Sequence, residues 1–275
     1  MLKKSIFLLF GLLIMFSLPS LTAFANEEIE EVPLTEEEIA QLKNNVGLTD
    51  EMINDLPITE LRILIEEGSV LEFHQAEVID IFEPEVFNPG EFKPMQGGDL
   101  DPKKIKITGY AFYNGKKTSG TYSGYRQYKL VGNWEWLTAP SWYLTDGFSV
   151  GWGSTDLKLP TRNNAVDEFW GYYYRYDGTK KTWYLTSSTR NPNTYEPNGG
   201  VGYKFDLRGG LTRHKGSLTQ YVYTRASRGD INVKFEYGHA QMVGATVTFG
   251  KNAGSFGIAP TFGVKTGYAA DEIVW

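Results

Sequence analysis

The 275-residue chain contains no cysteine. This absence excludes disulfide bonds, zinc–thiolate sites, iron–sulfur clusters and a cysteine nucleophile. Histidine is scarce, with three residues in all, and we expect each to be a surface or packing residue. The chain also lacks a G-x-S-x-G nucleophile elbow, a phosphate-binding loop, an H-E-x-x-H motif and a dinucleotide fingerprint. The sequence therefore predicts no metal and no cofactor, and it favours a protein that is not an enzyme.

Tyrosine and tryptophan are absent before position 102, although the whole chain has 17 Tyr and 7 Trp. Charge divides at the same place. Residues 26–101 carry 21 acidic and three basic side chains, a net charge of −18, whereas residues 102–275 carry 12 acidic and 22 basic ones, a net charge of +10. The overall charge of −6 therefore conceals two parts of opposite sign. We predict a boundary in the Gly/Pro-rich stretch 88–102, between an acidic segment and a basic, aromatic domain.

Residues 1–25 have the pattern of a secretory signal peptide. Two lysines near the start precede the apolar stretch 6–16, and A-x-A at 23–25 is a cleavage site. We therefore predict an extracellular protein that is cleaved after Ala25. A secreted protein without disulfides is typical of bacteria that lack an oxidising periplasm. The segment Val46 to Pro57 resembles the short helical leader region of assorted secreted Gram-positive proteins, and this resemblance implies nothing about activity.

The acidic segment 26–101 is expected to begin with short helices. Thr35 and Glu38 have the spacing of a capping box, in which each side chain bonds the other residue's backbone N–H. Gly47 and Gly68 are helix stops. Helices this short are unstable alone and must pack on something. The simplest partner is the basic domain of the same chain, so the segment is either a permanent subdomain or a removable pro-segment.

The domain 102–275 has the texture of antiparallel β-structure. Short runs rich in Tyr, Trp, Phe, Val and Thr alternate with turn dipeptides, which favours hairpins. We predict a mainly β fold, an antiparallel β-sandwich or barrel, with a short acidic helical N-terminal region. The expected turns are Asn114-Gly115, Asp146-Gly147, Asp177-Gly178, Asn198-Gly199 and Gly229-Asp230.

Aromatic clusters are the strongest functional signal. Alternation along a strand places Trp170, Tyr172 and Tyr174 on one face and Tyr173 with Arg175 on the other. Exposed Trp and Tyr stack on sugars, and nearby Lys and Arg attract anionic polymers. Our first hypothesis is a non-enzymatic protein that binds a cell-envelope or extracellular glycan, or another anionic wall polymer, and not nucleic acid. The candidate ligand-binding residues are Trp134, Trp136, Trp170, Tyr172, Tyr174 and Arg175.

Two alternatives remain open. The segment 243–264 alternates apolar residues with Gly, Thr, Ala or Lys, which fits a strand pair with one lipid face. The protein is then a toxin or bacteriocin-like effector that contacts membranes through this hairpin and is masked by the acidic segment. The second alternative is a glycoside hydrolase that uses two carboxylates, with Glu135 and Glu236 as candidates because both lie in strand-like runs.

The signal peptide yields the first testable prediction. The exported chain should begin at Asn26, because the A-x-A motif places cleavage after Ala25. Intact mass spectrometry of the secreted protein measures this directly. A signal-peptidase inhibitor that leaves the mass of the exported chain unchanged would contradict cleavage.

Overall fold

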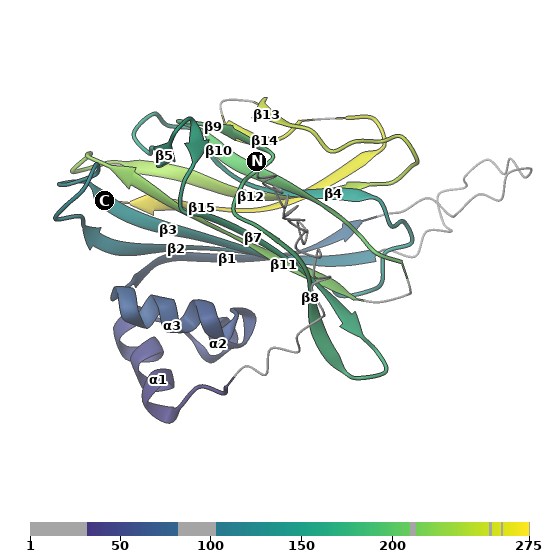
Figure 1. Cartoon of the computed structure of the whole chain (residues 1–275), viewed down its shortest axis with the longest axis horizontal. Coiled ribbons are helices and arrows are strands. Elements are labelled where there is room, and N and C mark those ends of the chain that lie inside the picture. The colour runs from purple at the N-terminus through teal and green to yellow at the C-terminus, as the bar shows by residue number, and fades with distance from the viewer. Residues whose placement is uncertain (1–31, 82–102, 210–212, 253–254, 260, 275) are drawn as a thin grey trace, which may run out of the picture.

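The computed structural model describes residues 32–81, 103–209, 213–252, 255–259 and 261–274. The fold is mainly β and antiparallel, as predicted, with two large sheets facing each other (Figure 1). Sheet A has six strands in the order β1-β2-β3-β11-β7-β8. Sheet B has five strands in the order β15-β12-β4-β10-β9. All pairings within the two sheets are antiparallel.

Sheet A draws its strands from both parts of the chain that the charge pattern separates. Its edge strand β1 comes from the acidic segment and pairs along its whole length with β2. The acidic segment is thus joined to the sandwich by backbone hydrogen bonds as well as by side chains. The strands of sheet A are β1 (Val70–Ile81), β2 (Lys103–Lys116), β3 (Arg126–Trp136), β11 (His214–Thr224), β7 (Phe169–Asp177) and β8 (Thr182–Thr189).

Sheet B is built only from the basic, aromatic domain. Two short two-stranded sheets accompany it, one formed by β5 and β6 and the other by β13 and β14. The strands of sheet B are β15 (Val264–Val274), β12 (Asp230–Ala240), β4 (Thr145–Trp152), β10 (Gly200–Asp206) and β9 (Thr194–Glu196), and the short pairs are β5 (Thr161–Arg162) with β6 (Ala165–Val166) and β13 (Phe249–Asn252) with β14 (Ser255–Ile258).

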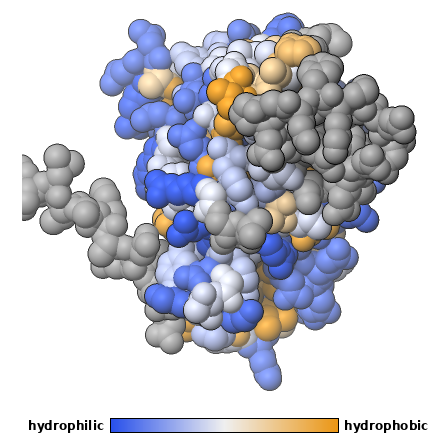
Figure 2. All heavy atoms as spheres, turned by 90° about the vertical axis from the view of Figure 1, so that its right-hand side faces the viewer, coloured by the Kyte–Doolittle hydropathy of each residue, from blue (hydrophilic) through white to orange (hydrophobic). Residues whose placement is uncertain are grey.

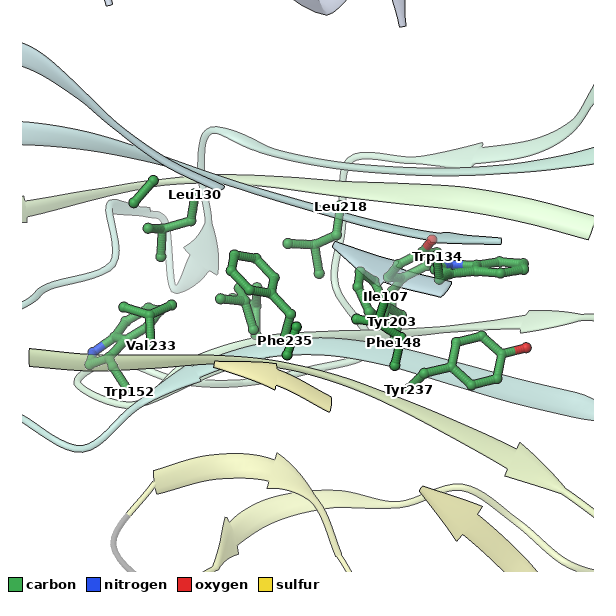
Figure 3. Close-up of a cluster of buried hydrophobic side chains, with 14 of the residues drawn as sticks. Ile107, Leu130, Trp134, Phe148, Trp152, Tyr203, Leu218, Val233, Phe235 and Tyr237 are labelled. Atoms are coloured by element: carbon green, nitrogen blue, oxygen red, sulfur yellow. The ribbon is translucent and has the colours of Figure 1, made fainter. Parts of the chain in front are cut away.

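The core lies between the two sheets and is rich in aromatic side chains (Figure 3). Phe235 of β12 projects toward sheet A, where Gly109 and Gly132 leave room for its ring. A Cβ atom on Gly109 would lie 2.3 Å from that ring, and one on Gly132 would lie 2.4 Å from it. The two glycines therefore set how closely the sheets approach, because real Cβ atoms do not reach such distances.

In the described part of the chain before β1, the structure has three short α-helices and one π-helical turn. The Thr35–Glu38 capping box is present, and Gly47 and Gly68 end their helices in the left-handed conformation. None of the described helices is long and apolar enough to cross a bilayer. These elements are α1 (Glu36–Gln41), η1 (Leu42–Val46), α2 (Asp50–Asp55) and α3 (Ile58–Glu67).

The helices cover part of the outer face of sheet A, below it in Figure 1. Their buried leucines and valine form a second hydrophobic cluster with Tyr110 and Phe112 of β2 and Val131 of β3. Lys129 of β3 is 1% exposed beneath α3 and forms ion pairs with Glu60 and Glu67. A buried lysine needs such partners because an unpaired charge in the interior is very unfavourable. Apolar packing and charge pairing therefore both hold the acidic helices on the basic sheet.

The described residues of the segment 241–263, which we call the strap, cross the outer face of sheet B and include β13 and β14, both at the top of Figure 1. Its strands pair with each other and not with sheet B. The strap lies on glycines of β4, β10 and β12, where side chains would occupy its place. A Cβ on these residues would lie 1.8–2.7 Å from strap atoms; they are Gly147, Gly151, Gly200, Gly202 and Gly238, and we call them the glycine floor.

Four of the five predicted turn dipeptides lie near strand ends, whereas the fifth lies inside a strand. Asp177-Gly178, Asn198-Gly199 and Gly229-Asp230 lie at or between strand ends, and Asn114-Gly115 lies at an irregularity near the end of β2. The prediction for Asp146-Gly147 is wrong, because both residues lie inside β4. The glycine there belongs to the floor beneath the strap, and the aspartate is buried. A dipeptide typical of turns is thus used for close packing instead.

The glycine floor yields a stability prediction. Gly151→Ala should lower the free energy of unfolding by about 1–3 kcal/mol, because its Cβ would lie 1.8 Å from the backbone oxygen of Phe256. Gly250→Ala, in the strap itself, is the matched control, since nothing lies within 4 Å of its Cβ. Urea unfolding of both variants measures the difference. Equal free energies for Gly151→Ala and Gly250→Ala would contradict the packing of the strap on the floor.

Candidate ligand-binding face

The candidate site lies on the outer face of sheet A, beside the helices. Phe169 and Tyr173 of β7 point into the core, so alternation places Trp170, Tyr172 and Tyr174 on the outside. All three are partly exposed. The rings of Tyr172 and Tyr174 have centroids 6.4 Å apart. The structure therefore brings these three candidate residues together on one surface.

A fourth ring and three cations complete this surface. Trp183 of β8 is partly exposed, and Lys215 of β11 lies over its ring at 4.6 Å and over the Tyr174 ring at 5.7 Å. Arg213 lies 5.8 Å from the Trp183 ring, and Arg190 lies 5.5 Å from the Trp170 ring. Cation–π attraction at such distances orients the charges along the rings. We call the seven residues the aromatic face: Trp170, Tyr172, Tyr174, Trp183, Arg190, Arg213 and Lys215.

The cations and the fourth ring were missed by sequence reasoning. Lys215 is opposite Tyr174 in the pairing of β11 with β7, although the two residues are far apart along the chain. Nothing in the sequence indicates that β11 is the neighbour of β7. The interleaving of Lys and Arg with the aromatic runs was the available signal, and it predicts a mixture of charges and rings without saying which ones meet.

Two predicted ligand-binding residues lie elsewhere. Trp134 and Trp136 are 1% and 0% exposed, inside the sandwich. The Trp134 ring stacks on Phe205 with centroids 4.7 Å apart, and the Trp136 indole N–H donates a hydrogen bond of 2.9 Å to the Tyr237 hydroxyl (Figure 3 shows Trp134 and Tyr237). The prediction that these two rings bind a ligand is wrong, because the W-E-W alternation turns both of them toward sheet B.

Arg175 is also separated from the aromatic face. It is opposite His214 in the pairing of β7 with β11, and the His214 ring is buried against Tyr173. Arg175 therefore lies on the inner side of β7, as alternation predicts, while the rings beside it in sequence lie on the outer side. The structure separates it from the three rings, and its role in ligand binding stays a prediction.

The helices reach the edge of the aromatic face at Tyr172. The pKa of the Tyr172 phenol is raised mainly by burial and further by the nearby carboxylate of Glu60 in α3, while Arg190 acts in the opposite direction. Glu60 also pairs with Lys129, and Glu67 accepts a hydrogen bond of 2.6 Å from the hydroxyl of Tyr221. The acidic helices thus occupy the part of the outer face next to the exposed rings.

The two candidate carboxylates of a hydrolase do not meet. Glu135 lies between two inward tryptophans of β3, so it faces outward from sheet A, where it pairs with Arg213. Glu236 lies between inward aromatics of β12 and faces outward from sheet B. Its Oε2 accepts a hydrogen bond of 2.8 Å from the Ile258 N–H of the strap and lies 2.9 Å from Lys234 Nζ. The pairing of these two carboxylates on one substrate is wrong, because they lie on opposite outer faces.

An aspartate–histidine pair is enclosed in the core. Asp146 Oδ2 lies 2.9 Å from His239 Nδ1, and both side chains are 0% exposed. The Tyr237 hydroxyl and the Ala240 N–H both donate to the Asp146 carboxylate. Such bonds compensate a buried carboxylate for the water it loses. The pair therefore holds the ends of β4 and β12 together, out of reach of a substrate.

The apolar side of the predicted membrane hairpin faces the protein. Val247, Phe256 and Ile258 are at most 3% exposed and rest on the glycine floor. Among the strap side chains that the structure describes, these apolar ones are therefore turned away from a bilayer. Insertion as a hairpin requires the strap to leave sheet B, and it stays a prediction.

Comparisons with known proteins place the chain in no family. No family model matches it, and no curated protein matches it by sequence. Among solved structures, a "Pore forming protein" is similar at a TM-score of 0.36 and 7% identity, over 75% of this chain and 92% of that one. Clostridium perfringens delta-toxin is similar at 0.22 and 5% identity, over 74% and 89%. The KRT10-binding region domain of the pneumococcal serine rich repeat protein PsrP is similar at 0.24 and 9% identity, over 61% and 88%. Likenesses this weak indicate neither a family nor a function.

Buried His214 yields a pH prediction. Burial, and then the charge of Arg175, lower the pKa of its imidazole from 6.5 to about 4. Between these values the unfolded chain takes up a proton that the folded chain does not, so the free energy of unfolding should fall as the pH drops from 6.5 to 4. Over this pH interval, the free energy of unfolding of His214→Gln should fall by about 2 kcal/mol less than that of the unsubstituted protein. Urea unfolding at several pH values measures this, and parallel profiles would contradict it.

Proposed function

We propose that the protein is secreted and binds an anionic glycan or another anionic polymer of the cell envelope, without catalysis, through the aromatic face. The single observation that carries this proposal is the interleaving of rings and cations on one partly exposed sheet surface. Aromatic rings stack on the apolar faces of sugars, and cations beside them attract negative charges on the same polymer. A surface that binds a charged glycan needs both the rings and the cations.

The geometry supports an extended ligand in preference to a compact one. Residues two apart on a strand are about 6.6–6.8 Å apart, so the outward rings of β7 form a row along the strand. Lys215 lies at the Tyr174 end of this row, and Arg190 lies at the end where Trp170 stands. A row of rings flanked by charges suits successive units of a chain molecule. Arg213 forms an ion pair with Glu135, and Arg190 and Lys215 add further positive charge to the same surface.

The charge near the rings supports the same ligand class. Residues 102–275 carry a net charge of +10, but residues 26–101 carry −18, so attraction for a polyanion comes from the cations of the aromatic face and not from the net charge of the chain. Such attraction weakens as salt is added, whereas stacking does not. The affinity should therefore decline as the ionic strength rises, and it should level off at the value that ring stacking alone provides.

Replacing two rings tests the proposal. The double variant Trp170→Ala/Trp183→Ala should bind purified Gram-positive wall material at least tenfold more weakly, because a stacked ring contributes about 1–3 kcal/mol. Co-sedimentation with the wall material measures the affinity, and dextran sulfate as a soluble polyanion should compete. Urea unfolding of the variant shows whether the fold is retained.

The matched control is Tyr268→Ala. Tyr268 is 56% exposed on the outer side of sheet B and has Lys234 over its ring at 5.6 Å, so it is an aromatic–cation pair outside the aromatic face. Its loss should leave binding unchanged. Equal binding by the unsubstituted protein and the double variant, or an equal loss in the control, would contradict the assignment.

A further inference from the structure

The neck of the strap carries exposed apolar side chains. At the neck the backbone N–H of Gln241 donates a hydrogen bond of 2.8 Å to the oxygen of Gly263, which closes the loop. Val243 is 80% exposed and Phe262 is 85% exposed, the two highest values for large apolar side chains among the described residues. Met242, in contact with the Gly263 position, is 39% exposed. We call Met242, Val243 and Phe262 the neck patch.

The fold makes no use of this patch. The apolar side chains that hold the strap on the glycine floor are Val247, Phe256 and Ile258, all buried. Two large apolar side chains exposed at the neck of one loop cost solubility, so they point to a partner that covers them. Figure 2 looks onto the end of the molecule at the right of Figure 1, where the hydrophobic patches are small and surrounded by hydrophilic surface.

The stretch of chain that contains the neck patch carries basic side chains and no acidic ones. No aspartate or glutamate occurs from residue 237 to residue 270. The two basic residues of this stretch, Lys251 and Lys265, are both exposed, and Lys265 is three positions from Phe262. Exposed apolar residues beside the exposed Lys265 complement a surface that is apolar beneath an anionic layer. Anionic lipid headgroups over acyl chains are such a surface.

The size of the patch also favours a bilayer over a folded protein partner. A stable protein interface covers about 800 Å² on each partner, which three side chains do not supply. A bilayer accepts single protruding side chains, because its interface adapts around each of them.

We propose that the neck patch is a membrane-surface contact that places Val243 and Phe262 in the headgroup region of an anionic bilayer, with Lys265 on the lipid phosphates. The strap remains on sheet B throughout. This contact differs from insertion of the strap as a hairpin, and it uses a surface separate from the aromatic face. The protein then has one surface for a wall polymer and another for the membrane beneath it.

Vesicle co-sedimentation of the mature chain tests the proposal. Vesicles of phosphatidylcholine with phosphatidylglycerol should bind the protein, and vesicles of phosphatidylcholine alone should bind it much less. Val243→Ser/Phe262→Ser should weaken binding roughly tenfold or more, because the buried apolar area is lost. The control, Val78→Ser/Val274→Ser, removes valines that are 55% and 62% exposed elsewhere and should bind as the unsubstituted protein does.

Several outcomes would overturn the proposal. One is binding that survives in Val243→Ser/Phe262→Ser, and another is an equal loss in the valine control. Equal binding to both kinds of vesicle would remove the role of Lys265 and overturn the choice of anionic lipid. Self-association that disappears in Val243→Ser/Phe262→Ser, measured by sedimentation velocity without vesicles, would assign the patch to a second copy instead. Dye release that accompanies binding would replace surface contact by insertion of the strap.

Discussion

The close approach of the two sheets is the constraint on which the rest of the structure depends. Phe235 fits against Gly109 and Gly132, and the sheets can be packed tightly only because those positions lack side chains. Once the aromatic core is enclosed, alternation sends every second residue of each strand outward. Both outer faces then carry side chains that must be covered, exposed to water or offered to a ligand. The functional surfaces of the protein follow from how each face is used.

The outer face of sheet A has a covered part and a partly exposed part. Acidic helices occupy one part through a hydrophobic cluster and through the ion pairs of Lys129. Rings and cations remain partly exposed on the other part. Sheet B is covered differently, because its glycine floor leaves a place for a strap from the same chain. Glu236 binds the strap backbone at Ile258, so a carboxylate that looks like a candidate catalyst in the sequence has a structural role.

The sequence was sufficient for features that depend on local periodicity. The antiparallel β fold, the Thr35–Glu38 capping box, the helix ends at Gly47 and Gly68, and the outward row on β7 are all consequences of neighbouring residues. Alternation also predicts that the rings of Trp134 and Trp136 share a face. It does not say which face is the core, and the choice of the outer one was wrong.

The rest depended on contacts between distant parts of the chain. Lys215 meets Tyr174 because β11 lies beside β7, and strand order leaves no mark in local sequence. Asp146-Gly147 has the composition of a turn, yet a buried histidine binds its aspartate and the strap occupies the space over its glycine. Local propensity is overridden at such positions because burial and packing are worth more.

The glycine floor has a consequence for how this sequence can vary. A residue larger than glycine on the floor is tolerated only if the strap becomes smaller or moves at the same place, since Phe249 and Phe256 occupy the space above Gly202 and Gly200. Floor and strap, separated by dozens of residues along the chain, are therefore expected to change together in descendants of this sequence. Packing on the glycine floor does not restrict which residue can occupy exposed neck positions such as Val243. Any restriction on what evolution accepts there must come from outside the fold.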